Sequence, residues 1–178
     1  AALCHGRALL AKGPRESSVR VEWTSGVPNV APLARLALAG EDEAGAWVRY
    51  LGEVTSLFGD LLGAEAVGVR MIIADGPHCS RFHVDQVLAR GVLNLLGSRT
   101  EWLPDEDIDR SLLGHAGGLD DETSGLVRCW DRLQRAEHGA LTVFKGTAWP
   151  GAAERAVVHR SPPEDGCRRL LLTLDWLD

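Results

Sequence analysis

Residues 79–87 read CSRFHVDQV and place a histidine and an aspartate two positions apart in an otherwise apolar run. Side chains alternate between the two faces of a strand, so we expect His83 and Asp85 on one side, about 7 Å apart at roughly 3.3 Å per residue. Phe82 and Val84 then fall on the other side. The stretch therefore predicts a strand with one apolar face and one face that bears an imidazole and a carboxylate.

A third ligand for a divalent metal is available far downstream. His159 ends the apolar run RAVVHR, just before two prolines. Two histidines and one carboxylate are the ligand set of non-haem Fe(II) sites, which leave coordination positions open. A carboxylate on an inward face is costly unless it is paired or metal-bound. Two alternatives need no metal: a hydrogen bond between His83 and Asp85, or a salt bridge from Arg81, which shares their predicted face.

Cys79 precedes His83 by four residues, so the sequence allows a metal site either with or without this cysteine as a ligand. A thiolate there would join the histidines and Asp85 in a closed tetrahedral zinc site, which has no position for a substrate. Alternatively, Cys79 is a small buried apolar residue.

An arginine ten residues after His159 lies on the next predicted strand. The fork of Arg169 is suited to bidentate binding of a carboxylate. Arg168 points to the opposite face, and a shift of one residue in register would exchange the two. Lys145 is either a contact for an anionic substrate or a solvated strand end, and Trp102 is either a pocket wall or a core residue.

The remaining chain predicts one domain over residues 1–178, a length that suits a single hydrophobic core. Residues 1–40 are expected to form an irregular arm with one strand at 18–23, and residues 41–65 an amphipathic helix. Residues 66–178 contain several short strands and are expected to form a β-rich metal-binding core. The pattern indicates an α+β protein with a barrel-like β core.

Composition limits the partners and the location. The formal net charge of -6 argues against a nucleic-acid-binding protein, which relies on clustered basic residues. No apolar run approaches the roughly 18 residues of a membrane span. The four cysteines form no CxxC pair and no secretory signal precedes them, so we expect a reducing cytoplasm. The chain does not begin with Met, so the sequence does not exclude a targeting segment that has been removed.

The order HxD, distant His and Arg ten residues later resembles the iron- and 2-oxoglutarate-dependent dioxygenases of the cupin-like superfamily. The resemblance implies a double-stranded β-helix, or jelly-roll, core with flanking helices. It also implies that His83, Asp85 and His159 bind Fe(II), and that Arg169 binds the far carboxylate of 2-oxoglutarate. The expected activity is oxidation of a small-molecule or peptide substrate, which the sequence does not identify.

A closer resemblance covers roughly residues 70–178, in CSRFHVDQV, TEWLP, FKGTAWPG, VVHRSPP and RRLLLTLDW. These segments are similar to an uncharacterised bacterial family, the domain of unknown function 1826. Some members of that family are thought to be linked to zinc homeostasis. This resemblance implies Zn(II) as the alternative metal, held in a non-catalytic zinc-binding protein.

Overall fold

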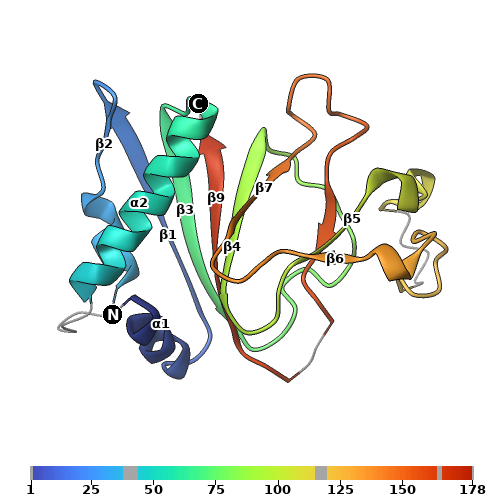
Figure 1. Cartoon of the computed structure of the whole chain (residues 1–178), viewed down its shortest axis with the longest axis horizontal. Helices are drawn as coiled ribbons and strands as arrows, with labels where there is room; N and C mark the ends of the chain where they lie inside the picture. The colour runs from blue at the N-terminus through green and yellow to red at the C-terminus, as the bar shows by residue number, and fades with distance from the viewer. Residues whose placement is uncertain (1, 38–43, 115–119, 164–165, 178) are drawn as a thin grey trace.

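Two antiparallel sheets meet in the middle of the molecule (Figure 1). In the computed structural model, which describes residues 2–37, 44–114, 120–163 and 166–177, the large sheet has the order β2-β1-β3-β9-β4-β7 and the small sheet β6-β5-β8. The strands are β1 (Arg15–Thr24), β2 (Val27–Pro28), β3 (Ala66–Ala74), β4 (Ala89–Leu96), β5 (Glu101–Leu103), β6 (Gln134–Arg135), β7 (Leu141–Lys145), β8 (Val158–Arg160) and β9 (Arg169–Leu177).

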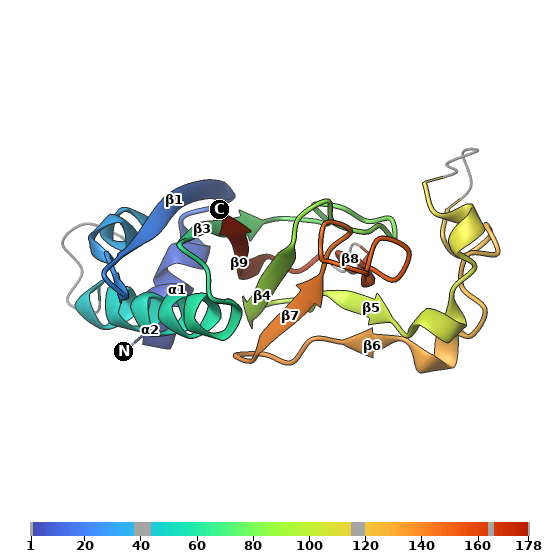
Figure 2. The same cartoon turned by 90° about the horizontal axis from the view of Figure 1, so that it is seen from above.

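Two helices, α1 (Ala2–Ala11) and α2 (Ala44–Leu62), cover one face of the large sheet (Figures 1 and 2). Helix α2 buries Trp47, Leu51 and Phe58, which recur at helical spacing and join the main hydrophobic core. It ends at Leu62 and is followed by Gly63, whose positive φ of 65° is the usual conformation after a helix terminus. The prediction of a helix at 41–65 is confirmed for 44–62, while residues 41–43 lie outside the described residues.

Alternation along β9 divides the large sheet into two functional faces. Leu170, Leu172 and Leu174 are buried in the core beneath the helices. Arg169 and Thr173, which alternate with them, line a cavity on the opposite face. Because side chains of a strand alternate between its faces, the same sheet supplies the main core on one side and a polar cavity on the other.

The expectation of an irregular arm at residues 1–40 is wrong for most of that segment. Residues 2–11 form α1, and β1 pairs antiparallel with β3 from Arg15 to Glu22. A 3-10 helix, η1, follows at Ala31–Leu36. The predicted strand at 18–23 lies within β1, where Val19 and Val21 face the core. The pairing partner is some fifty residues away, so the local composition of Gly, Pro and Ser did not reveal it.

The alternation of residues 81–97 predicts one long strand or two short ones, and the structure contains a single strand there. Only β4 is regular, and the preceding segment joins the small sheet through a single bridge between His83 and His159. The backbone turn at Gly146–Ala148 holds this segment: the amides of Gly146 and Thr147 donate to the carbonyls of Leu88 and Asp85 at 3.0 and 2.9 Å. The alternation around His83 is therefore fixed by tertiary contacts.

The far end of the molecule is a lobe that we call the distal lobe, made of residues 104–114 and 120–135 (Figure 2). It contains three 3-10 helices, η2 (Asp105–Asp107), η3 (Arg110–Leu112) and η4 (Trp130–Arg132). Its apolar residues, including Ile108 and Leu126, pack against Phe82 and Val158 beside the two histidines. Among the residues that the structure describes, no helix is both long and apolar enough to cross a bilayer.

Candidate metal centre

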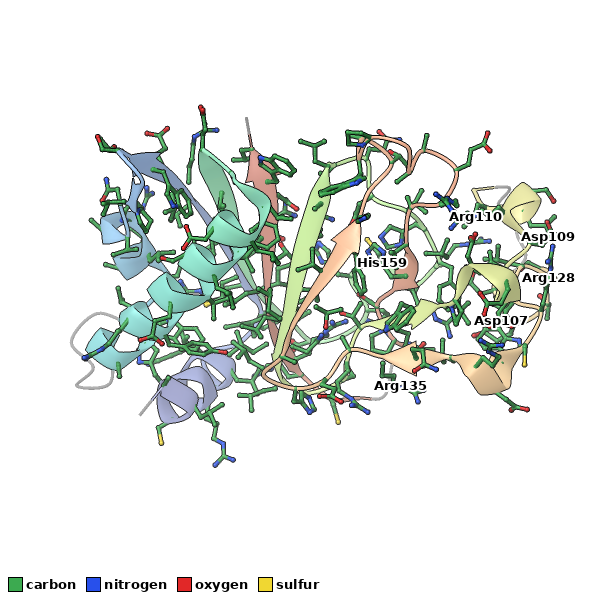
Figure 3. All side chains as sticks on the ribbon, turned by 45° about the horizontal axis from the view of Figure 1, so that its top comes forward. Asp107, Asp109, Arg110, Arg128, Arg135 and His159 are labelled. Carbon is green, nitrogen blue, oxygen red and sulfur yellow. The ribbon has the colours of Figure 1, made fainter. Side chains whose placement is uncertain are left out.

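His83, Asp85 and His159 meet in one group although they come from distant parts of the sequence. One possible ligand atom of each lies within 4.8 Å of the others, and the two imidazole centroids are 4.6 Å apart. The backbones of His83 and His159 exchange two hydrogen bonds of 3.0 Å, which set the histidines side by side. Figure 3 shows His159 nearer the middle of the molecule than Asp107, Asp109 and Arg128 of the distal lobe. The pairing predicted from HxD and a distant His is thus present as a cluster.

The hydrogen bonds of both imidazoles leave the same nitrogen facing the group. Nδ1 of His83 lies 2.8 Å from the carbonyl oxygen of Arg81, and Nδ1 of His159 lies 3.1 Å from that of Val157. A carbonyl oxygen only accepts, so each Nδ1 carries a proton and donates it. In a neutral imidazole the lone pair is then on Nε2, which is the arrangement that orients metal-binding histidines.

The contact between His159 and Asp85 needs a cation. Nε2 of His159 lies 3.3 Å from Oδ2 of Asp85, and Oδ2 is buried without a hydrogen bond among the described residues. With the proton of His159 on Nδ1, two lone pairs would face each other across this gap. Either a proton on Nε2 or a metal ion between the atoms removes that repulsion. Ligands about 2.1 Å from one ion lie up to about 4.2 Å apart, so the three side chains fit a divalent metal after small adjustments.

The second oxygen of Asp85 is held by an arginine that the sequence did not single out. Nη1 of Arg90 donates to Oδ1 of Asp85 at 2.6 Å, while its Nε and Nη2 donate to the carboxylate of Asp175 at 2.6 and 3.1 Å. The alternative of a salt bridge from Arg81 is wrong: Arg90 pairs with Asp85, while Arg81 is exposed and contacts His83 through its carbonyl. Arg90 and Asp175 are directly opposite on β4 and β9, a pairing that only the sheet register creates.

The charges around the group favour an ionised Asp85 and a neutral His83. Burial alone would raise the pKa of Asp85, but a proton on Nε2 of His159, 3.3 Å away, and the charge of Arg90 would outweigh it, so in the absence of a metal this pKa lies below its ordinary value. Burial lowers the pKa of His83, and the nearby charges of His159 and Arg90 act in the same direction. Both shifts favour the protonation states that ligate a metal.

A cavity of about 190 Å³ adjoins the group and contains Arg169. Arg169 is 2% exposed, and its Nη2 donates to Oδ1 of Asn94 and Oγ1 of Thr100, both at 3.1 Å. Arg168 lies on the other face of the strand, where it pairs with Asp75 and donates to the carbonyl of Leu10. Of the two arginines that the sequence allows at the site, Arg169 is therefore the one that lines the cavity.

The other predicted pocket residues occupy different positions. Cys79 is exposed and lines the cavity, but its sulfur is not part of the three-residue ligand group found among the described residues. Trp102, paired with His159 across β5 and β8, packs against an apolar cluster of which Ile72, Val92 and Leu171 line the cavity. Lys145 is exposed, and its Nζ lies 4.7 Å from the ring centroid of Trp149. Trp102 therefore packs in the core next to the cavity, and both Trp102 and Lys145 lie outside the cavity lining.

A second charged network anchors the strand that bears His159. The next residue, Arg160, is 4% exposed and donates to Glu101 at 3.0 Å and to Asp121 at 3.1 Å. Its guanidinium also lies 4.4 Å from the ring centroid of Phe82. Asp121 in turn accepts the backbone amide of Phe82 at 2.8 Å. The distal lobe thereby joins both histidine-bearing segments, a role that the sequence did not indicate because each partner lies in a different segment.

Comparisons with known proteins agree with this architecture. The sequence model of a family described as "Protein of unknown function (DUF1826)" matches residues 9–175. No curated protein matches the chain. Among solved structures, the chain is similar to the dioxygenase for auxin oxidation of rice, at 13% identity and a TM-score of 0.51. The alignment covers 93% of this chain and 58% of the rice enzyme.

A second similar structure is the 2-oxoglutarate complex of the dioxygenase for auxin oxidation 1 of Arabidopsis thaliana, at 12% identity and a TM-score of 0.51. The alignment covers 93% of this chain and 66% of that one, so the chain spans less than two thirds of either enzyme. At such identities the likeness shows the fold alone. The predicted α+β fold with a cupin-like, double-stranded β-helix core and flanking helices is confirmed.

Proposed function

The chain belongs to the family described as protein of unknown function (DUF1826), whose description assigns no activity, and we propose from the site itself that it is a metal-dependent oxygenase. The proposed cofactors are Fe(II), bound by His83, Asp85 and His159, and 2-oxoglutarate, bound at one carboxylate by Arg169. The observation that supports this most is the pair of facing acceptors, His159 Nε2 and Asp85 Oδ2, 3.3 Å apart. The similar structure of the Arabidopsis enzyme is a complex with 2-oxoglutarate.

Each residue of the site has a part in this proposal. His83 and His159 would hold the ion through Nε2, while the Nδ1–H of each donates to a backbone carbonyl. Asp85 offers Oδ2, since Arg90 holds its other oxygen. The chemistry supplied when Fe(II) and 2-oxoglutarate are bound is oxidation of a substrate C–H bond by dioxygen.

Apolar side chains shield the site from water. The ring of Phe144 stacks on the imidazole of His159, with centroids 4.9 Å apart and an interplanar angle of 25°. Phe144 belongs to a buried cluster with Ile72, Val92 and Leu171, and the last three also line the cavity. Burial beside the ligands strengthens charge interactions within the site and limits competing reactions with water.

The test is turnover of 2-oxoglutarate by protein purified without oxygen and loaded with Fe(II). We expect consumption of 2-oxoglutarate with release of succinate, and loss of this activity in Arg169→Gln. Arg168→Gln is the matched control, because Arg168 lies on the opposite face and pairs with Asp75. Thermal unfolding of both variants separates loss of activity from loss of the fold, and Arg169→Lys retains the charge. An Fe(II)-loaded wild type that consumes no 2-oxoglutarate contradicts the proposal.

The alternative is a non-catalytic zinc-binding protein in which Cys79 completes a closed site. Its support is that Cys79 lines the same cavity as the two histidines. X-ray absorption of the zinc-loaded protein tests it: a four-coordinate ion with one sulfur ligand favours zinc binding and argues against an oxygenase. A cytoplasmic location is part of either proposal, and the free thiols of all four cysteines are consistent with a reducing compartment.

A further inference from the structure

Strand β9 directs a buried hydroxyl into the cavity. Thr173 is 8% exposed and lines the cavity, and its Oγ1 has no hydrogen-bond partner among the described residues. A buried polar atom without a partner costs about 1–3 kcal/mol, so native proteins keep few of them. Such an atom at a cavity wall indicates that a ligand supplies the partner.

Arg70 lies directly opposite this hydroxyl. In the β3–β9 pair, Arg70 is in register with Thr173, and both line the same cavity. Directly opposed side chains of an antiparallel pair have Cβ atoms about 4.5–5.5 Å apart, so one small group can contact both. The described carboxylate that pairs with Arg70 is Glu16, and its Oε1 lies 3.6 Å from Nη1 of Arg70, beyond hydrogen-bond distance. The guanidinium is therefore available to a ligand.

The charges of the cavity favour an anion. Four arginines line it, and none of the described residues that line it is acidic. Arg90 is occupied by Asp85 and Asp175, and Arg160 donates to Glu101, Asp121 and Glu122, none of which is among the residues that line the cavity. A hollow lined by one sign of charge with poorly polarisable walls concentrates ions of the opposite sign.

We propose that Arg70 and Thr173 form an anion subsite that binds a carboxylate group of the substrate, so that the substrate is a small organic acid. The guanidinium and the hydroxyl both donate to the carboxylate. Along β9, Thr173 is four residues from Arg169, about 13 Å at roughly 3.3 Å per residue. The two subsites therefore bind different carboxylates. The assignment to the substrate rests on the proposed function, whereas the subsite itself does not.

Binding of propionate to the full chain, labelled with ¹⁵N and free of metal, tests the subsite by NMR. We expect propionate to shift the Nε–H signal of Arg70 and the amide signals around Thr173, and the neutral isostere propionamide to leave them unchanged. Arg70→Gln and Thr173→Val should each weaken propionate binding about tenfold or more, since hydrogen bonds to a charged group are lost. Arg168→Gln is the control and should leave the affinity unchanged. Arg70→Lys should retain part of it.

Several outcomes overturn the inference. Equal shifts with propionamide, or full affinity in both Arg70→Gln and Thr173→Val, exclude the subsite. Loss of propionate binding in Arg169→Gln but not in Arg70→Gln places the anion elsewhere. Displacement of propionate from Arg70 by saturating 2-oxoglutarate assigns the subsite to the cosubstrate and removes the substrate class. If propionate binds as expected but the Fe(II)-loaded protein consumes no 2-oxoglutarate, the proposed function fails and the subsite stands.

Discussion

Replacing Arg90 with Met removes the positive charge between Asp85 and Asp175 while keeping much of the side-chain volume. The side chains of Arg90, Asp85 and Asp175 are 21%, 10% and 16% exposed. Breaking a fully buried ion pair by removing one partner costs about 3–5 kcal/mol, and an exposed pair contributes about 0–1 kcal/mol. For these mostly buried carboxylates we expect Arg90→Met to lower the free energy of unfolding by about 2–4 kcal/mol. In a chain of 178 residues this corresponds to a fall in Tm of roughly 5–15 °C.

The same substitution has two further effects on Asp85. Its carboxylate loses the donor that orients it, so metal affinity should fall about 10–100-fold. Its pKa, held below the ordinary 3.8 in part by Arg90, should rise. A depressed pKa contributes stability above the unfolded pKa and loses it as pH falls through the folded pKa. Acid unfolding of the variant should therefore begin at higher pH than in the wild type.

The measurements are thermal and urea unfolding of metal-free protein and metal titration by calorimetry. The control is Arg20→Met, because Arg20 pairs with Glu22 at 2.9 Å but both side chains are at least half exposed. It should cost under about 1 kcal/mol. If Arg90→Met unfolds like Arg20→Met and binds metal like the wild type, Arg90 does not hold Asp85 in the way described.

Two other predictions follow from the site. A Cβ at Gly146 would lie 2.0 Å from the carbonyl oxygen of Val87 and 2.9 Å from that of Asp85. Gly146→Ala should therefore lower the free energy of unfolding in urea by about 1–3 kcal/mol and weaken metal binding. The control is Gly45→Ala, in open space on α2, which should raise the free energy of unfolding by about 0.5–1 kcal/mol; equal effects of the two substitutions would refute the contact. His83 has a lowered pKa, so metal-free protein should lose stability as pH falls below 6.5 toward the folded pKa, and an unchanged stability–pH curve in His83→Gln would contradict this.

The order of residues is enough to predict the cluster of His83, Asp85 and His159, but not the residues that hold it in place. HxD, the distant histidine and the arginine ten residues later are visible in the order of residues, and the structure gathers the first three and places Arg169 in the adjoining cavity. Arg90 and Arg160 were missed, because their partners come from strands and loops whose neighbours depend on tertiary pairing.

The same limit explains the errors in the fold. Only residues 18–23 of β1 are predicted as a strand, and the rest of β1 falls in the expected irregular arm because its partner β3 is far away in sequence. The segment before β4 alternates like a strand, but its backbone bonds go to His159 and to the turn at Gly146. Periodicity of side chains predicts which face a residue takes, whereas long-range hydrogen bonds decide whether the segment is a strand.

The most direct test is the metal stoichiometry of protein purified without oxygen, compared with that of His159→Ala. We expect one divalent ion per chain in the wild type and none in the variant, with the variant still folded by circular dichroism. His138→Ala is the control, since His138 is exposed and contacts the carbonyl of Gly97 outside the ligand group. A His159→Ala protein that is folded and retains its metal would show that these three residues do not form the metal site.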